Sequence, residues 1–117
     1  MVYEALVRAL IGLVMVVAAC SAKDTAGSSV DGADLYAKFC ATCHGVDGKP
    51  DPTMTARLGV RDLTSPEFRA RATPALVENQ IRKGSQNKLM PAFEGAFTDA
   101  QLAAIAEYVM SSGFGKR

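Results

Sequence analysis

The chain has 117 residues, of which 13 are lysine or arginine and 12 are aspartate or glutamate, so its formal net charge is only +1. This length corresponds to one domain. Because the two signs of charge are interspersed, the composition excludes binding of nucleic acid through a large single-sign surface. Apolar residues fill 17 of the first 20 positions but only about 41% of the rest. The chain therefore divides near Cys20.

The first segment reads as an export signal. Residues 9–20, ALIGLVMVVAAC, carry no charge, and twelve residues are too few to cross a bilayer as a helix, which takes about 20. Such a stretch is typical of the apolar region of a secretory signal, although Glu4 precedes it; a buried helix or a short anchor are the alternatives. The following residues 20–30 are mostly small and polar and predict a flexible tether, which leaves residues 31–117 as the folded domain.

The end of the signal, Val17-Ala18-Ala19-Cys20, resembles the lipobox of bacterial lipoproteins. The resemblance implies that residues 1–19 are a lipoprotein signal peptide, cut off just before Cys20, and that Cys20 is then acylated. The mature protein would be exported to the periplasm and anchored by lipid to a bacterial membrane. An ordinary cleaved signal and a free thiol are the competing interpretations of this cysteine.

Helix signals dominate the folded domain, and no stretch alternates between apolar and polar residues as a strand does. A first helix is expected from residue 31 to about residue 43. Ser65-Pro66 and Thr73-Pro74 each place a capping hydroxyl before a proline at the first helical position and predict two short helices. The second of these would bury residues 76, 77 and 81 on one side and end at Gly84.

The last helix has the strongest signals. Thr98 and Gln101 form a capping box, an apolar stripe follows, and Gly113 is expected to end the helix. Residues 85–97 are left as an irregular loop. The sequence thus predicts an all-α fold of about four to five short helices. Its core is thin for about 80 residues without tryptophan, so an additional group is expected to fill the centre.

Cys40, Cys43 and His44 form a C-x-x-C-H motif. This pattern indicates covalent attachment of haem c: two thiols can add to the two vinyl groups of the haem, and the histidine that follows binds the iron. A thioredoxin-like redox pair would need a βαβ context that this chain lacks. A zinc site would need about four ligands, and only these three and the distant Cys20 are present.

The single histidine limits what can bind on the other side of the iron. Because His44 is the only one, two histidines of this chain cannot ligate the same haem. Methionine is the natural sixth ligand, and Met54, Met90 and Met110 remain after export. Met110 is most simply a packing residue, and Met54 a loop residue covering the haem. Pro91 disfavours helix at Met90, and this extended backbone favours Met90 as the ligand; a core methionine is the alternative.

With these residues the chain resembles the class I (monohaem) c-type cytochromes of bacteria. The resemblance covers residues 31–112 and rests on GADLYAKFCATCHG, KLMPAF and IAEYV. It implies a small cytochrome c fold with one covalent haem at its centre. In this family a glycine and an aromatic residue of the first helix pack against the last helix, here Gly32 and Tyr36 against Ile105 and Tyr108.

The same resemblance implies that a proline carbonyl following the motif accepts a hydrogen bond from the histidine Nδ1–H. Pro52 is the candidate for this contact with His44, with Pro50 as the alternative. Such a bond fixes the histidine tautomer and raises its basicity as an iron ligand.

The implied function is single-electron transfer between membrane-associated redox partners such as an oxidase, a reductase or a dehydrogenase. No general base, nucleophile or open metal position is evident, so we predict no enzymatic activity and no small-molecule substrate. Two alternatives remain: a five-coordinate haem that binds a gas, and an electron-accepting subunit of a larger enzyme. Arg82, Lys83 and Lys88 flank the Met90 loop, where they would steer an acidic partner or form only a solvated surface.

Overall fold

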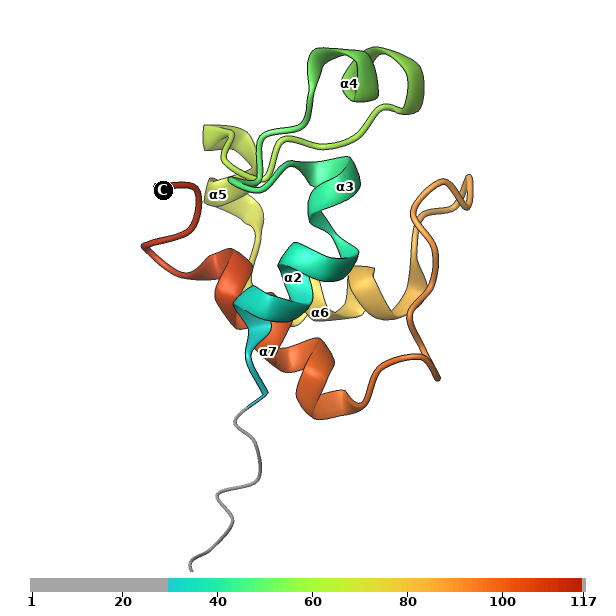
Figure 1. Ribbon diagram of the computed structural model, residues 1–117, viewed down its shortest axis with the longest axis vertical. Helices are drawn as coiled ribbons and strands as arrows, with labels where there is room; N and C mark the ends of the chain where they lie inside the picture. The colour runs from blue at the N-terminus through green and yellow to red at the C-terminus, as the bar shows by residue number, and fades with distance from the viewer. Residues whose placement is uncertain (1–29, 117) are drawn as a thin grey trace, which may run out of the picture.

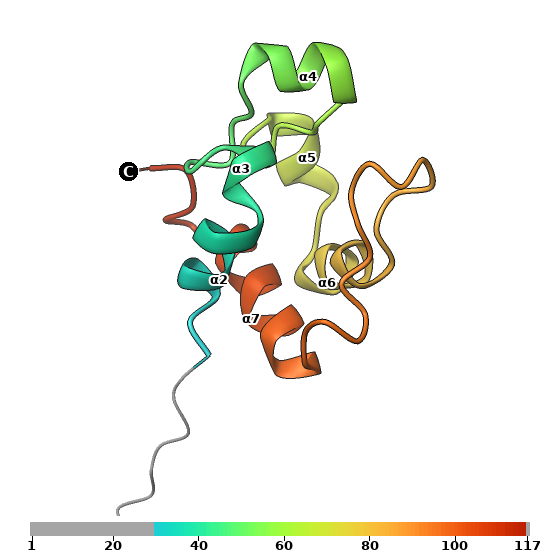
Figure 2. The same ribbon diagram turned by 45° about the vertical axis from the view of Figure 1, so that its right-hand side comes forward.

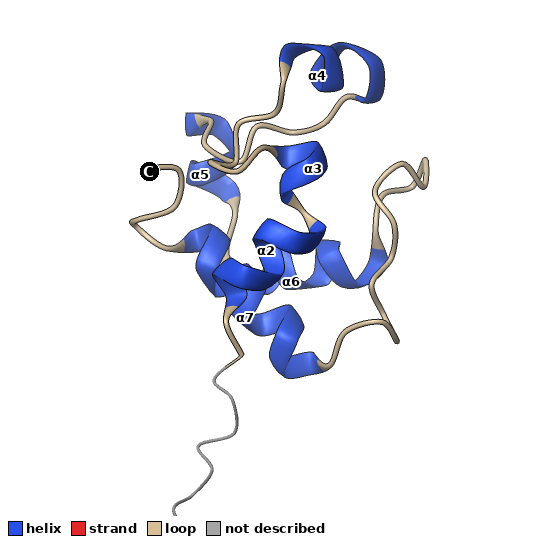
Figure 3. Cartoon of the chain, in the orientation of Figure 1, coloured by secondary structure: helices blue, strands red, loops and turns tan. Residues whose placement is uncertain are grey.

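Residues 30–116 are described by the structure, a computed structural model, and they fold into α-helices joined by loops (Figure 3). The predicted signal peptide, Cys20 and nearly all of the tether lie outside these residues. Within residues 30–116 there is no β-strand, and no helix is long and apolar enough to cross a membrane. The helices are α2 (Gly32–Phe39), α3 (Ala41–His44), α4 (Pro52–Leu58), α5 (Pro66–Arg71), α6 (Pro74–Lys83) and α7 (Asp99–Met110).

The helix starts follow the capping signals of the sequence. Ser65 and Thr73 cap α5 and α6 through their side-chain oxygens, and Thr98 and Gln101 form both bonds of the predicted capping box of α7. Each cap satisfies backbone N–H groups that have no partner inside the helix. These three predicted helices and the all-α class are therefore confirmed.

Two features of the helices differ from the sequence-based prediction. The expected single helix over residues 31–43 is broken, because Cys40 takes φ −113° and ψ −36° and separates α2 from α3. Helix α4 was not predicted at all, although Asp51 caps it, Pro52 occupies its first position and Gly59 ends it in the left-handed region. The described residues therefore hold six helices rather than four or five.

Helix α7 ends at Met110, three residues before the predicted stop at Gly113. The backbone leaves the helix at Ser111, which is extended with φ −64° and ψ 153°. The guanidinium of Arg69 in α5 donates hydrogen bonds to the carbonyl oxygens of Val109, Met110 and Ser111 at this end. The Ser111 carbonyl also accepts the Phe114 N–H. The last carbonyls of a helix lack partners inside it, and a positive charge there also interacts favourably with the helix dipole. Arg69 thus joins α5 to the end of α7.

The core lies where α7 crosses α2 and α6 (Figures 1 and 2). A Cβ atom on Gly32 would lie 2.0 Å from the backbone oxygen of Ala104, so only glycine allows this close approach of α2 to α7. The ring of Tyr36 lies 5.5 Å from that of Tyr108. The packing of Gly32 and Tyr36 against the last helix is thereby confirmed. The buried cluster consists of Tyr36, Ile81, Leu102, Ile105, Val109 and Phe114.

Helix α6 buries less of its predicted apolar side than expected. Ile81 is buried and Val77 is half-buried, but Leu76 keeps 59% of its surface exposed. Phe114, which follows the last helix, supplies part of the missing core instead. Its ring packs edge-on against Tyr36 and Tyr108, at 5.3 Å from each ring centre.

Candidate haem-binding site

The C-x-x-C-H residues lie on one helical turn formed by α3 and the residue before it. The backbone N–H groups of Cys43 and His44 donate to the carbonyl of Cys40 at 3.2 and 2.9 Å. Side chains three and four positions apart share one face of a helix. Cys40 and Cys43 are both half-buried free thiols. The turn therefore presents two thiols and an imidazole on the same side.

The His44 ring is oriented by a backbone carbonyl. Its Nδ1 lies 3.2 Å from the carbonyl oxygen of Arg61, so the tautomer that donates from Nδ1 leaves the Nε2 lone pair free for a metal. Burial lowers the His44 pKa, and the hydrogen bond to Arg61 only partly opposes this effect. The ring is thus held in the neutral form that can ligate iron.

The prediction that Pro52 supplies this carbonyl was wrong. Pro52 is exposed and is the first residue of α4, where its carbonyl belongs to the hydrogen-bonding pattern of the helix. The Arg61 carbonyl takes the place expected of a proline carbonyl. Every residue carries a backbone carbonyl oxygen, so the side chain at position 61 gives no sequence signal for this contact.

Two further groups beside the motif, the Cys40 thiol and the Tyr36 hydroxyl, are held in their neutral forms. Burial, and secondarily the charge of Cys43, raises the pKa of the Cys40 thiol to about 11. The buried Tyr36 hydroxyl donates a 2.7 Å hydrogen bond to the carbonyl of Gly45, the residue after His44. Burial also raises the pKa of Tyr36, so its hydroxyl remains a donor. This bond ties the end of the motif to the core.

Met90 lies in the loop between α6 and α7 and is half-buried against the same core cluster that Cys40 contacts. In both ribbon views this loop rises to the level of α3 (Figures 1 and 2). An aromatic row links the two segments: Phe97 packs edge-on against Phe39 at 5.1 Å and stacks on Phe93 at 5.0 Å. The structure thus connects the Cys40 and Met90 segments through one apolar layer.

The other two methionines lie elsewhere. Met54 is on α4 and lines a hollow of about 440 Å³ together with Thr42, the residue between the two cysteines. Met110 is the last residue of α7, and its sulfur is 4.0 Å from the Arg69 guanidinium. Neither lies in the loop that holds Met90.

Of the basic residues Arg82, Lys83 and Lys88 near this loop, Arg82 forms ion pairs within the domain. Arg82 is engaged in ion pairs with Glu78 and Asp99, each at 2.8 Å. Its charge is therefore used within the domain, between α6 and the start of α7. Lys83 and Lys88 are exposed.

The donor atoms present suit a haem. Within residues 30–116, no three histidine, cysteine, aspartate or glutamate side chains gather around a common point as zinc ligands would. Two thiols, one imidazole nitrogen and a thioether are instead carried by two segments that meet the same core. This is the set that a haem c uses for two covalent bonds and two axial ligands.

Sequence reasoning missed two contacts around these residues. The Tyr36 hydroxyl and the Arg61 carbonyl both secure the His44 segment. Tyr36 could have been noticed as a buried aromatic with a donor that needs a partner. A backbone carbonyl carries no such signal.

Among the curated relatives of this chain, two are each 33% identical to it. One is the Cbb3-type cytochrome c oxidase subunit FixP of Bradyrhizobium sp. (strain ORS 278), matched over 73% of this chain and 28% of the relative. The other is the fructose dehydrogenase cytochrome subunit of Gluconobacter japonicus, matched over 74% of this chain and 19% of the relative. The chain thus spans less than a third of the length of either relative.

The fold is also similar to a solved structure, the KustC0563 c-type cytochrome, with a TM-score of 0.61 and 32% identity. The match covers 68% of this chain and 94% of that one. Residues 28–109 match the family described as cytochrome C oxidase, cbb3-type, subunit III. The chain therefore belongs to this family of c-type cytochromes, which carry electrons on a covalently bound haem c.

Proposed function

We propose that this domain is a monohaem, class I electron carrier, with thioether bonds to Cys40 and Cys43 and with His44 and Met90 as the axial ligands. One observation carries the proposal. The motif folds into a single turn whose histidine has its Nδ1 occupied by the Arg61 carbonyl, which leaves Nε2 to bind iron. When bound, the haem supplies an iron that cycles between the ferrous and ferric states.

Residues of this chain would set the reduction potential of that iron. The hydrogen bond from His44 Nδ1 fixes the ring and makes Nε2 a stronger ligand. The half-buried Met90 supplies a thioether, a ligand that raises the reduction potential. The rings of Phe39, Phe97 and Phe93 pack on one another between the two segments, and Phe39 keeps 51% of its surface exposed. A site with both axial positions filled transfers electrons and leaves no open position for a substrate.

The positions of the other methionines support Met90 as the sixth ligand. That ligand must approach the iron from the side opposite His44. Met54 shares its hollow with Thr42 of α3 itself, and Met110 lies at the end of α7 beside Arg69. Met90 alone among the three lies in a separate loop that reaches the core cluster contacted by Cys40.

The partners are proposed to be other redox proteins. The two relatives are named as subunits of an oxidase and of a dehydrogenase, which supports a domain that accepts electrons from one protein and passes them to another. The same names favour a second candidate, in which this domain is the electron-accepting subunit of a larger enzyme complex. Co-purification of the tagged, matured protein from its native membrane distinguishes a fixed subunit from a mobile carrier.

A redox titration followed by absorbance tests the carrier function against gas binding. We expect a reversible one-electron transition, and we expect the ferrous protein not to bind carbon monoxide at neutral pH, because both axial positions are filled. A ferrous protein that binds carbon monoxide readily would instead support the five-coordinate, gas-binding alternative.

We also propose that residues 1–19 are a lipoprotein signal, that residues 20–30 tether the domain of residues 31–117, and that Cys20 carries the lipid. The lipobox-like sequence before Cys20 supports this proposal. The product would be periplasmic and anchored to a bacterial membrane, where more than one acyl chain gives stable attachment. Labelled fatty acid should enter the wild-type protein and not the Cys20→Ala variant; equal labelling of both would refute the anchor.

A further inference from the structure

The loop that carries Met90 is closed on itself by one serine. The backbone N–H of Ser85 donates to the Met90 carbonyl at 3.0 Å, and the Met90 N–H donates to the Ser85 hydroxyl oxygen, also at 3.0 Å. Both backbone polar groups of Met90 are therefore bonded to the same residue. Two bonds to one partner fix the position and the direction of the Met90 backbone.

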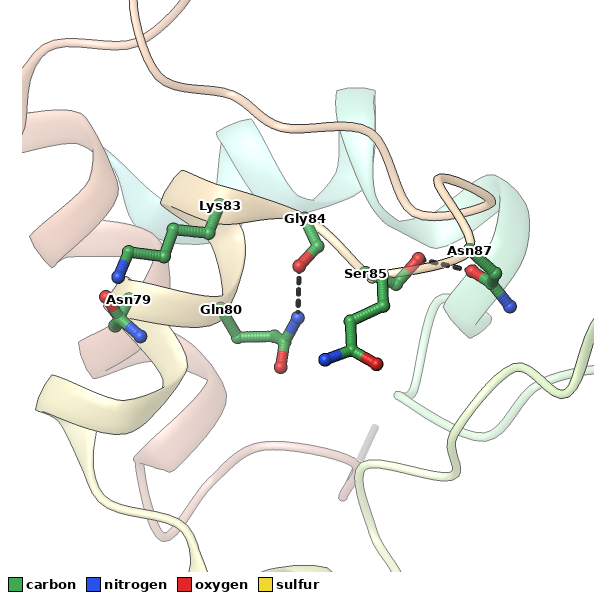
Figure 4. Close-up of a pocket in the computed structure, with 7 residues that line it drawn as sticks. Asn79, Gln80, Lys83, Gly84, Ser85 and Asn87 are labelled. Carbon is green, nitrogen blue, oxygen red and sulfur yellow. Dashed lines mark hydrogen bonds between the residues drawn. The ribbon is translucent and has the colours of Figure 1, made fainter.

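The Ser85 hydroxyl is itself held in place (Figure 4). It donates a 2.6 Å hydrogen bond to the side-chain oxygen of Asn87, and the same oxygen accepts the Leu89 N–H at 3.1 Å. The Gln80 amide of α6 donates to the carbonyl of Gly84 at 2.6 Å. The Ser85 hydroxyl thus both accepts and donates a hydrogen bond, and Gly84, the residue before Ser85, is bonded to α6.

The loop also lies directly against the end of α6. Gly84 has φ +70°, and a Cβ atom there would lie 2.6 Å from the Met90 carbonyl oxygen. Beyond Met90, the Phe93 N–H donates to the Ile81 carbonyl at 3.1 Å. The Met90 backbone is therefore secured on both sides, and Ser85 supplies the bonds nearest to it.

A methionine ligand needs such support. Its side chain has three rotatable bonds, so the thioether alone does not determine where the sulfur lies. Pro91 restricts the backbone conformation at Met90 but does not attach the loop to α6. A ligand bonded to a metal through a neutral sulfur is also displaced by stronger donors when its backbone can move away.

We propose that Ser85 is a positioning residue for the sixth haem ligand: its hydroxyl and N–H hold the Met90 backbone so that the thioether stays on the iron. The inference rests on the proposed axial role of Met90. It predicts that losing the hydroxyl raises the fraction of molecules in which Met90 has left the iron.

The test measures imidazole binding to the ferric holoprotein, because imidazole must displace Met90. For Ser85→Ala we expect the apparent association constant to rise about fivefold, which corresponds to the loss of one hydrogen bond of about 1 kcal/mol. The Met–Fe(III) charge-transfer band should weaken in parallel at intermediate imidazole concentrations. Ser85→Thr keeps a hydroxyl and should restore the wild-type constant.

Two further variants separate this role from general destabilisation. Ser112 is exposed and has no side-chain hydrogen bond among the described contacts, so Ser112→Ala should leave the constant unchanged. Asn87 is exposed and bonds the Ser85 hydroxyl, and Asn87→Ala should raise the constant by about twofold. Asn87→Ala provides the readout even if Ser85→Ala fails to mature.

The possible results are distinct. Suppose that the wild-type protein shows the Met–Fe(III) band but imidazole binds Ser85→Ala no more tightly than the wild type. The inference about Ser85 is then wrong, and Met90 ligation stands. If only Asn87→Ala matures, the same comparison is made with that variant. If the wild-type protein has no such band, the proposed role of Met90 fails, and the inference fails with it.

Discussion

The Met90→Ala variant is expected to lose the Met–Fe(III) charge-transfer band entirely while it keeps its covalent haem. Without the thioether, the ferric iron is left with His44 and an open position that water or added ligands can occupy. The reduction potential should fall by a few tenths of a volt, a fraction of the range of about 0.8 V that axial ligands span. Absorbance spectra and a redox titration of the matured variant measure both effects.

Met54→Ala provides the matched control. Met54 is half-buried like Met90, but it lies on α4 in a hollow shared with Thr42. Its removal should leave the band intact and change the potential little. If Met54→Ala abolishes the band and Met90→Ala does not, the axial assignment is wrong.

The Gly32→Ala variant is expected to lower the free energy of unfolding of the holoprotein by about 2–4 kcal/mol. Alanine at a helical glycine normally stabilises by up to about 1 kcal/mol. Here the added Cβ would meet the oxygen and carbon of the Ala104 peptide at 2.0 and 2.5 Å. Because those atoms are backbone, α2 and α7 must move apart and the core around Tyr36 opens. Thermal denaturation followed by circular dichroism measures the loss.

Gly113→Ala is the control for this effect. A Cβ atom at Gly113 would meet no atom within 4 Å, so its stability should stay within about 0.5 kcal/mol of the wild type. A Gly32→Ala variant that is as stable as Gly113→Ala would show that α2 and α7 do not cross at Gly32.

The sequence predicted those parts of the fold that local chemistry determines. The capping box of Thr98 and Gln101 and the caps at Ser65 and Thr73 lie where they were expected, because each depends on residues close in the chain. Helix α4 carried the same kind of signal in Asp51 and Pro52 and could have been predicted.

Other features depend on contacts between distant segments and had no local signal. Arg69 bonds the carbonyls at the end of α7 from 40 residues away in the sequence. The carbonyl that orients His44 belongs to Arg61 rather than Pro52, because the backbone path places that oxygen beside the ring. The face of α6 was predicted from spacing alone, but Leu76 keeps 59% of its surface exposed among the described residues.

The motif residues were predicted from chemistry, whereas the way they are held came only from the structure. Spacing alone identifies Cys40, Cys43 and His44 as a set. It cannot reveal that the Tyr36 hydroxyl secures the peptide after His44, nor that Ser85 bonds both sides of the Met90 backbone. These supporting contacts join residues five to nine positions apart and arise from the tertiary fold.

The most direct test of the proposed site is the mass of the protein after denaturation, when it has been expressed together with a cytochrome c maturation system. We expect the wild-type chain to keep the mass of one haem, and the Cys40→Ser/Cys43→Ser double variant to keep none. A wild-type chain that releases its haem on denaturation, or that never acquires one, would contradict covalent attachment at Cys40 and Cys43, and with it the electron-carrier function proposed for this chain.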